Sequence, residues 1–214
     1  PVQYLLGQTE FMGLNLLCGP DALIPRGDSE PVAEAAVQLL RDYKSQRIAD
    51  ICTGGGAYAL ALAAFLPRSR VWATDISAAA LRLARRNAAQ LGLAPRVDFL
   101  HGDLLQPLRQ LGLQFDLIIS NPPYIASNDI GALSPQVRRE PRLALDGGED
   151  GLDFYRRLAG EAAQLLNTAG LLIVEHGAEQ QERLIRLFAG QGWHILQRIE
   201  DYGHRPRGLA LQRS

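Results

Sequence analysis

Hydrophobic positions along the chain fall into short apolar runs, separated by segments in which apolar residues recur every three or four positions. The runs are Arg47–Cys52, Val71–Asp75, Val97–His101, Phe115–Ser120 and Leu171–His176. Apolar runs that alternate with amphipathic helices are typical of a parallel sheet with helices on both faces. The pattern therefore predicts an α/β fold.

The segments between the runs predict the helices that connect one strand to the next. Helical spacing extends over Ala57–Leu66, Ser77–Leu91, Asp153–Leu166 and about residues 178–191. Ser77 and Asp153 are expected N-caps, and Gly92 stands just past a helix end. Near the C-terminus, Trp193–Ile199 and Gly208–Gln212 are close enough in sequence to pair as an antiparallel ribbon at the sheet edge. We expect a Rossmann-like, seven-stranded mixed sheet whose last strand is antiparallel.

Two segments fall outside this alternation. Before the first strand of the sheet, Phe11–Leu17 predicts a short hairpin and Glu30–Tyr43 predicts a helix. Ser127–Gly151 is the longest irregular stretch, and a loop of that length in a compact domain is more often functional than idle. We assign residues 1–28 to a linker and hairpin, and residues 29–214 to the α/β domain.

The composition limits the class of protein. With 47% hydrophobic and 21% charged residues, the 214 residues have the usage of a globular domain. The formal net charge of -1 argues against a broad phosphate-binding surface and disfavours direct nucleic-acid binding. No apolar stretch approaches the roughly 20 residues of a membrane span, and no signal-peptide pattern is present. We expect a cytoplasmic protein without membrane contact.

A glycine-rich turn follows the first apolar run. Cys52-Thr53-Gly54-Gly55-Gly56 leads from a strand into a helix, where open α/β sheets bind ligands, and glycine allows a ligand to approach the backbone. Asp75 ends the next run and can accept hydrogen bonds from two ribose hydroxyls, with Ile76 beside it. After the third run, Asp103 and Leu104 would offer an acceptor and an apolar contact to an adenine. The three strand ends predict a site for an adenosyl ligand.

The same layout also suits a nicotinamide dinucleotide, whose pyrophosphate would bind at the helix N-terminus. Ala59 occupies the third position of the G-x-G-x-x-G pattern, and Ala is tolerated there in some dinucleotide sites. The turn could also be a tight structural turn without a ligand.

The fourth run leads directly into Asn121-Pro122-Pro123-Tyr124. Two adjacent prolines remove two backbone donors and restrict φ, so the loop is stiff and its carbonyl oxygens are exposed. A planar NH2 group has a delocalised lone pair, and its methylation requires hydrogen-bond acceptors that hold both hydrogens. Asn121 Oδ1 and the Pro122 carbonyl oxygen supply two acceptors, and Tyr124 offers an aromatic face. We expect these three residues to catalyse methyl transfer from S-adenosylmethionine to a planar nitrogen, with Asn121 also bordering the cofactor.

These features resemble the class I methyltransferases with an Asn-Pro-Pro-Tyr motif, and within them the glutamine methyltransferases of peptide-chain release factors. The resemblance covers nearly the whole chain. It also includes Pro1–Glu10 with Phe11, Leu23–Arg26 with Glu30, Glu140-Pro141 with Ala144-Leu145, and Gly147–Leu152 with Tyr155-Arg156.

The resemblance implies methylation of the side-chain amide of the glutamine in a Gly-Gly-Gln loop of a release factor, a partner protein in translation termination. S-adenosylmethionine would be the methyl donor and S-adenosylhomocysteine the product. Substrate contacts are implied for Asn121, Pro122, Pro123 and Tyr124, and for Arg26, which could equally be a solvated surface charge. The resemblance makes 29–214 the methyltransferase domain and implies an N-terminal helical substrate-recognition domain, which these residues lack.

Two positions depart from the family pattern. The glycine turn usually has Gly where this chain has Cys52, and Pro-Glu-Thr-Glu usually stands where this chain has Gly27-Asp28-Ser29-Glu30. Because Cys disfavours a positive φ more strongly than Gly does, the shape of the turn is expected to differ slightly.

The remaining titratable residues point to no second site. The histidines lack the clustering of metal ligands, and we predict no metal; they are His101, His176, His194 and His204. Glu175 and His176 are neighbours on a strand, so they face opposite sides and are not expected to act together.

Other functions stay open at this stage. The same tetrad could orient a glutamine of a ribosomal protein, or the exocyclic amino group of adenine or guanine in nucleic acid. Two further classes are a dinucleotide-dependent oxidoreductase and a non-catalytic adapter with this fold.

Overall fold

The computed structural model describes residues 1–43 and 46–213, and its centre is a single sheet of seven strands in the order β5-β4-β3-β6-β7-β9-β8. The strands are β3 (Gln46–Ile51), β4 (Ser69–Asp75), β5 (Val97–His101), β6 (Phe115–Ser120), β7 (Leu166–Glu175), β8 (Trp193–Glu200) and β9 (Pro206–Arg213). β9 pairs antiparallel with β7 and with β8, and the other pairs are parallel. The predicted Rossmann-like mixed sheet is confirmed.

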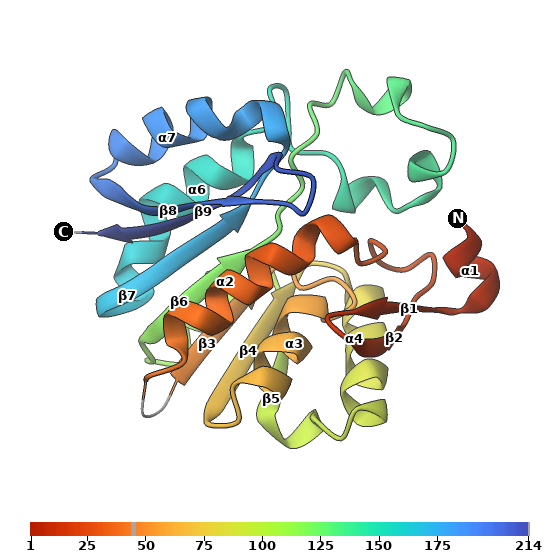
Figure 1. Ribbon diagram of the computed structural model, residues 1–214, viewed down its shortest axis with the longest axis horizontal. Coiled ribbons are helices and arrows are strands. Elements are labelled where there is room, and N and C mark those ends of the chain that lie inside the picture. The colour runs from red at the N-terminus through yellow and green to blue at the C-terminus, as the bar shows by residue number, and fades with distance from the viewer. Residues whose placement is uncertain (44–45, 214) are drawn as a thin grey trace.

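Helices cover both faces of the sheet (Figure 1). One face carries α2 (Glu30–Leu40), α3 (Ala57–Phe65) and α4 (Ala78–Gln90), and the other carries α5 (Gln106–Arg109), α6 (Asp153–Glu161) and α7 (Gln181–Ala189). Alternate residues of a strand enter different cores: Leu117 and Ile119 pack on the α2 and α3 side, and Ile118 packs on the α6 and α7 side. Because central strands are buried on both faces, they appear in the sequence as unbroken apolar runs.

Most element boundaries agree with the sequence prediction within a few residues. Ser77 caps α4 and accepts a hydrogen bond from Ala80 N at 3.1 Å, as predicted, and Gly92 follows that helix with a left-handed φ of 69°. The expected N-cap at Asp153 is wrong, because Leu152 occupies the cap position. The Asp153 carboxylate instead pairs with Arg156 at 2.9 Å, which a charge in the first turn of a helix can do.

The helix predicted over Asp153–Leu166 ends earlier than expected. α6 stops at Glu161, a 3-10 turn follows over Ala162–Leu165, and β7 begins at Leu166, five residues before its predicted start. Leu166 pairs with Phe115 and Leu171 pairs with Leu117, so the register shift leaves extra residues in β7. The early start of this strand therefore arises from pairing rather than from a local pattern.

The N-terminal segment holds a short helix, α1 (Val2–Leu6), and a hairpin of β1 (Gln8–Phe11) and β2 (Leu14–Leu17). The helix was not predicted, and the hairpin begins three residues before its predicted start. Asn87 of α4 attaches the hairpin to the glycine turn: its Oδ1 accepts from Leu17 N at 2.7 Å, and its Nδ2 donates to the carbonyls of Leu17 at 3.1 Å and Gly55 at 2.9 Å.

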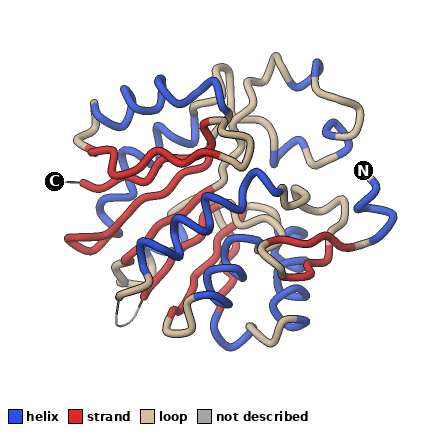
Figure 2. Tube along the Cα trace, in the orientation of Figure 1, coloured by secondary structure: helices blue, strands red, loops and turns tan. Residues whose placement is uncertain are grey.

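Residues 125–151 form the long irregular loop that the sequence predicted, drawn mostly as loop in Figure 2. Three short 3-10 turns interrupt it, at Ile130–Ala132, Val137–Arg139 and Arg142–Ala144. A parallel bridge between Ile125 and Asp146 brings its two ends together. Within residues 1–43 and 46–213, no helix is both long and apolar enough to cross a membrane.

Candidate active site

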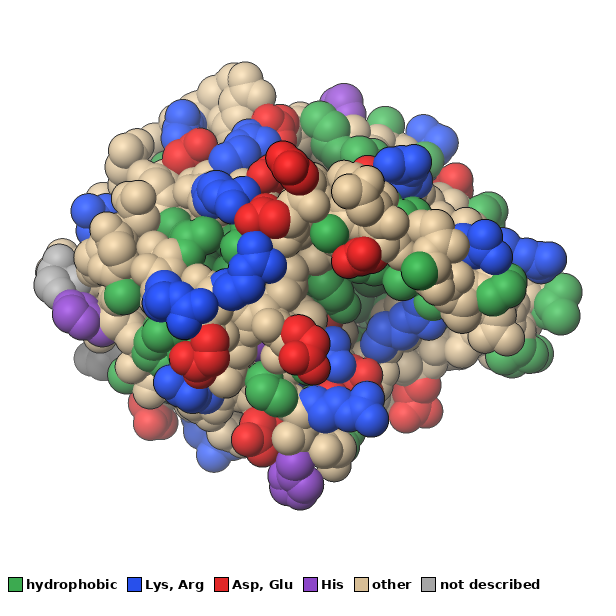
Figure 3. Space-filling model, turned by 90° about the horizontal axis from the view of Figure 1, so that it is seen from above, with side chains coloured by type: hydrophobic (Ala, Val, Ile, Leu, Met, Phe, Trp, Pro, Cys, Tyr) green, Lys and Arg blue, Asp and Glu red, His purple; other side chains and the backbone are tan. Residues whose placement is uncertain are grey.

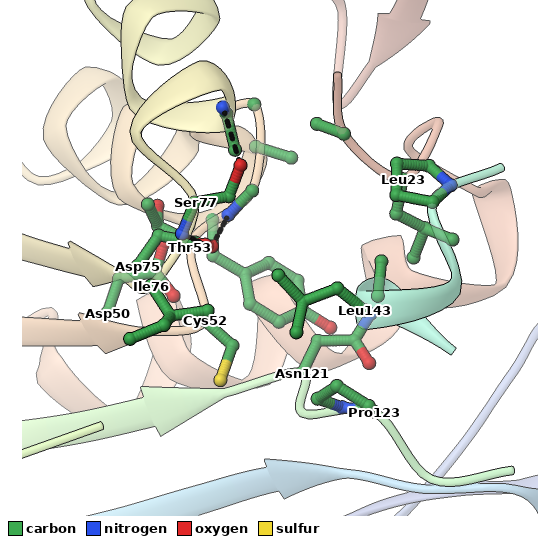
Figure 4. Close-up of a pocket in the computed structure, with 18 of the residues that line it drawn as sticks. Leu23, Asp50, Cys52, Thr53, Asp75, Ile76, Ser77, Asn121, Pro123 and Leu143 are labelled. Carbon is green, nitrogen blue, oxygen red and sulfur yellow. Dashed lines mark hydrogen bonds between the residues drawn. The ribbon is translucent and has the colours of Figure 1, made fainter. Parts of the chain in front are cut away.

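The carboxyl ends of β3, β4, β5 and β6 open into a cavity with about 1050 Å³ of empty space, part of it continuous with solvent. We call it the adenosyl pocket. The expected cofactor residues that line it are Cys52, Thr53, Gly54, Gly55, Asp75, Ile76, Asp103, Leu104 and Asn121. Figure 4 shows Asn121 and Pro123, on the loop after β6, across the pocket from Asp75 and Ser77.

Gly56 does not line the adenosyl pocket. It is the N-cap of α3 with a φ of 89°, and a Cβ at this position would lie 3.2 Å from Ala84 Cβ and from Leu60 Cδ1. Its role in the structure is therefore to allow the tight turn that brings the preceding residues to the pocket.

Cys52 begins the glycine turn with a φ of 60°, in the left-handed region that glycine occupies freely. The residue thus adopts the conformation that the family pattern would assign to Gly, at a cost of roughly 1 kcal/mol for a side chain that is not branched at Cβ. Burial and the nearby carboxylates of Asp75 and Asp50 raise the pKa of the Cys52 thiol, which keeps it protonated.

The Asp75 carboxylate is held by the backbone on both of its oxygens. Oδ2 accepts from Gly54 N and Oδ1 accepts from Ser77 N, each at 2.8 Å. Burial raises its pKa, and these hydrogen bonds oppose that shift. Each carboxylate oxygen has a second lone pair, so Asp75 can still accept from two hydroxyl groups.

Apolar and acidic side chains lie beside Asp75. Ile76 is 49% exposed, and Leu104 has a positive φ of 45°, with its carbonyl held by Thr74 Oγ1 at 2.8 Å. Asp103 forms a two-pronged ion pair with Arg157, at 3.1 and 2.6 Å. A flat apolar ring would cover Ile76, and the remaining lone pairs of Asp103 could accept from an amino group.

Asp50 also lines the pocket and was not among the predicted cofactor residues, although it lies only two residues before Cys52. It is buried at the end of β3, where its Oδ2 accepts from Thr53 Oγ1 at 2.5 Å and from Ala59 N at 3.0 Å. With it, four carboxylates line the pocket, from Asp21, Asp50, Asp75 and Asp103. Arg26 is the only basic residue among the described residues of the lining, and it is paired with Glu140.

A second cavity, with about 820 Å³ of empty space, adjoins the first on the far side of Asn121. We call it the acceptor pocket. It is lined by Tyr124, by apolar residues of the long loop such as Leu133 and Val137, and by a polar group made of Asp28, Glu175, Arg26 and Arg207. Four residues line both cavities, and they are Leu23, Arg26, Asn121 and Ala144.

Asn121 thus stands at the junction of the two pockets. Its side chain is half-buried, and no described residue forms a hydrogen bond with its amide. Pro122 is buried and lines neither pocket, so only its backbone can act there. Pro123 lines the adenosyl pocket and Tyr124 the acceptor pocket, so the tetrad separates the two spaces.

Burial and the charge of Glu175 raise the pKa of the Tyr124 phenol to about 12. Within the described chain the phenol has no hydrogen-bond partner, so a neutral donor faces the acceptor pocket. Glu175 lies deeper and accepts from Ser29 Oγ at 3.1 Å and from the Tyr58 hydroxyl. His176 instead contacts the Gly177 carbonyl at 2.8 Å, so the two neighbours have separate partners, as expected.

Arg207 of β9 also lines the acceptor pocket. Two carboxylates hold the guanidinium, that of Asp201 at 3.1 Å and that of Asp28 at 3.3 Å. In residues 1–43 and 46–213, no group of three or more His, Cys, Asp and Glu side chains is placed to bind a metal ion.

Comparison with known proteins links this chain to methyl transfer. A family model described as the Methyltransferase small domain matches residues 29–137. A release factor glutamine methyltransferase of Moorella thermoacetica is 50% identical over 97% of this chain and 73% of its own length. The protein of the same name from Geobacter sulfurreducens is 45% identical over 90% of this chain and 66% of its own length.

Solved structures share the architecture at lower identity. The ribosomal protein L11 methylase of Lactobacillus delbrueckii subsp. bulgaricus aligns with a TM-score of 0.66 and 22% identity, over 90% of this chain and 81% of that chain. TrmN from Thermus thermophilus aligns with a TM-score of 0.62 and 25% identity, over 85% of this chain and 48% of that chain. The first of these supports the fold alone, because its identity is low.

Proposed function

Because the chain belongs to the release factor glutamine methyltransferase family, we propose that it methylates the side-chain amide of the glutamine in a Gly-Gly-Gln loop of a peptide-chain release factor. Membership in the family makes the chain a methyltransferase and implies that it uses S-adenosylmethionine. What we propose beyond family membership is the target glutamine, the loop that surrounds it and the residues that act on it.

The charge of the adenosyl pocket favours S-adenosylmethionine over a dinucleotide. Among the described residues, three of the four carboxylates that line the pocket, those of Asp21, Asp50 and Asp75, form no salt bridge with a basic side chain, whereas Asp103 pairs with Arg157. The one described basic side chain of the lining, Arg26, is neutralised by Glu140. A pyrophosphate would be repelled there, whereas a sulfonium and an ammonium group are attracted. We assign the ribose to Asp75, the adenine to Ile76, Leu104 and Asp103, and the cationic part of the ligand to the region near Asp50.

The position of Asn121 carries the proposal, because its unpaired amide lies where the two pockets meet. S-adenosylmethionine supplies an electrophilic methyl group from one side. From the other side, the acceptor pocket would admit the unbranched chain of a glutamine between Leu133, Val137 and Tyr124. Asn121 Oδ1 and the Pro122 carbonyl then accept the two amide hydrogens and hold the nitrogen in line with the methyl group.

The residues around the tetrad complete the proposed acceptor site. The Tyr124 phenol and the Arg207 guanidinium are two donors available to the substrate amide oxygen. Arg26 shapes the border of both pockets through its ion pair with Glu140. We propose that residues 29–214 form the methyltransferase domain. Residues 1–28, which precede it, contribute Phe11, Leu23 and Arg26 to the pockets and are therefore also part of the site.

Acidic and basic side chains are interspersed on the face seen in Figure 3, where hydrophobic side chains lie in a hollow among them. On this face the described Lys and Arg side chains form no continuous basic area, which favours a protein loop over nucleic acid as the substrate. We also propose a cytoplasmic location, as expected from the sequence. The two free cysteines support it, because free thiols are usual in a reducing compartment.

The test is transfer of labelled methyl groups from S-adenosylmethionine to a purified release factor and to its Gln→Ala variant in the Gly-Gly-Gln loop. We expect label in the first protein alone, and equal labelling of both would contradict the proposed target.

Asn121→Ala should lower kcat on the order of 100-fold and leave S-adenosylhomocysteine affinity nearly unchanged. Asn128→Ala, an exposed change in the same loop, is the matched control. Full activity of Asn121→Ala would remove the tetrad from the chemistry.

A further inference from the structure

Gln180 lies where three backbone segments meet behind Tyr124. Its side-chain Nε2 donates to the Tyr124 carbonyl at 2.8 Å and to the Gly151 carbonyl at 3.3 Å, while its Oε1 accepts from Gly177 N at 3.0 Å. One half-buried amide therefore connects the end of the tetrad, the Gly147–Leu152 turn and the end of β7.

The Gly147–Leu152 turn fits closely against the backbone of the tetrad. A Cβ on Gly147 would lie 2.7 Å from the Pro123 carbonyl oxygen and 2.8 Å from Tyr124 Cα. A Cβ on Gly151 would overlap the Tyr124 carbonyl and lie 2.9 Å from Gln180 Nε2. These glycines are required by the close approach of two backbones and of the Gln180 amide.

Backbone hydrogen bonds extend the same connection beyond Tyr124. Ile125 N donates to the Leu145 carbonyl at 3.0 Å, and Gly147 N donates to the Ile125 carbonyl at 2.8 Å. The residues after the tetrad are thus paired like a short parallel strand, and Gln180 holds the last carbonyl before that pairing begins.

The two prolines couple the hydrogen bond between Gln180 and the Tyr124 carbonyl to the positions of Pro122 and Asn121. Pro122 and Pro123 restrict φ, so few soft torsions separate the Tyr124 carbonyl from the Pro122 carbonyl. A displacement at Tyr124 is therefore passed on to the Pro122 carbonyl and to Asn121. Methyl transfer is sensitive to such a displacement, because an error of about 1 Å in a reacting group can cost on the order of 100-fold in rate.

We propose that Gln180 is a positioning residue of this enzyme, whose side-chain amide holds the Tyr124 carbonyl and so orients the Pro122 carbonyl and the Asn121 amide toward the substrate nitrogen. The inference rests on the proposed function for the identity of that nitrogen. In this proposal the Gly147–Leu152 segment supports the backbone of the tetrad.

Gln180→Glu is the sharpest test, because it preserves size and the acceptor for Gly177 N but turns a second oxygen toward the Tyr124 and Gly151 carbonyls. We expect kcat on a release factor to fall on the order of 10- to 100-fold, with little change in KM for S-adenosylmethionine. Gln191→Glu adds the same charge at an exposed site in the turn after α7 and should leave both constants unchanged. If Gln180→Glu does not fold, Gln180→Met removes the same donors without a charge, and the same separation of kcat and KM is expected.

Hydrogen exchange gives a readout that needs no methyl acceptor. The Ile125 and Gly147 amides should exchange faster in Gln180→Glu than in Gln191→Glu, while amides of β3 and β4 stay equally protected. A normal kcat in a folded Gln180 variant, or unchanged exchange at Ile125 and Gly147, would overturn the inference. Failure of the unmodified chain to label a release factor would instead contradict the proposed function, and the exchange comparison would still test the role of Gln180.

Discussion

Asp50 is buried beneath the glycine turn, and its environment gives a measurable pH dependence. Burial raises its pKa from 3.8 to about 7, and the hydrogen bonds from Thr53 and Ala59 offset only part of that shift. Between these two pKa values the folded state holds a proton that the unfolded state has released. The contribution of Asp50 to stability is therefore lost progressively as the pH rises from about 4 to about 7.

Asp50→Asn should remove this dependence, since Asn resembles the protonated carboxyl and does not titrate. We expect the free energy of unfolding of the variant, relative to the unmodified chain, to increase from pH 4.5 to pH 7, as measured by urea denaturation with roughly 0.5 pH spacing. Asp129→Asn, at an exposed position of the long loop, serves as the comparison. A constant difference across this range would show that Asp50 titrates normally.

Single positions also show what local pattern can reveal. The tetrad was recognised because two prolines after an apolar run have a strong effect on the backbone within a few residues. Cys52 was recognised as a departure from the glycine of the family pattern. The neighbouring sequence could not show that Cys52 itself adopts a left-handed φ. For Arg26, the sequence left open whether it contacts substrate or is a surface charge. Its partner Glu140 lies 114 residues away, so no local pattern could show the ion pair.

At the scale of elements, the segment before α2 and the long loop are joined by Glu140 over both pockets. Its side chain is fully buried, accepts from Ile24 N at 2.9 Å and pairs with Arg26. The connected residues Leu23, Arg26 and Ala144 line both cavities. Glu140 therefore sets the spacing between two segments that together cover the ligand sites.

Glu140→Gln should weaken this connection, because the amide keeps one acceptor oxygen but loses the charge that binds Arg26. We expect the dissociation constant for S-adenosylhomocysteine to rise about tenfold, the effect of losing one hydrogen bond to a charged group. Isothermal titration calorimetry would measure it, with the exposed Glu149→Gln in the same loop as the matched control. Equal affinities in the two variants would show that Glu140 does not shape the adenosyl pocket.

On the scale of the whole molecule, the adenosyl pocket collects residues from segments far apart in the chain. Phe11 comes from the hairpin, Asp50 and Asp75 from β3 and β4, Asn121 from the tetrad, and Phe154 from α6. A ligand that contacts all of these segments binds the folded state and has no comparable site in the unfolded chain. Its binding is therefore coupled to global unfolding.

S-adenosylhomocysteine at about 100 times its dissociation constant should stabilise the fold by roughly 2.7 kcal/mol. For a domain of this size, that corresponds to a rise in Tm of about 5–10 °C in differential scanning calorimetry. NAD at the same concentration should produce no shift, because its pyrophosphate meets the carboxylates of Asp21, Asp50 and Asp75. A shift with NAD and none with S-adenosylhomocysteine would favour the oxidoreductase alternative.

The sequence by itself determined the order and type of the main elements, the glycine turn, the tetrad and the methyltransferase family. These are properties of short segments, because burial on two sheet faces, helical periodicity and the torsional effects of Gly and Pro all act locally. Only the tertiary structure decided that Asn121 stands between two pockets, that Glu140 joins Ile24 and Arg26, and that Gln180 holds the Tyr124 carbonyl. These contacts of Glu140 and Gln180 join polar groups more than 50 residues apart, and a polar residue in a loop carries no local signal of the partner that the fold brings to it.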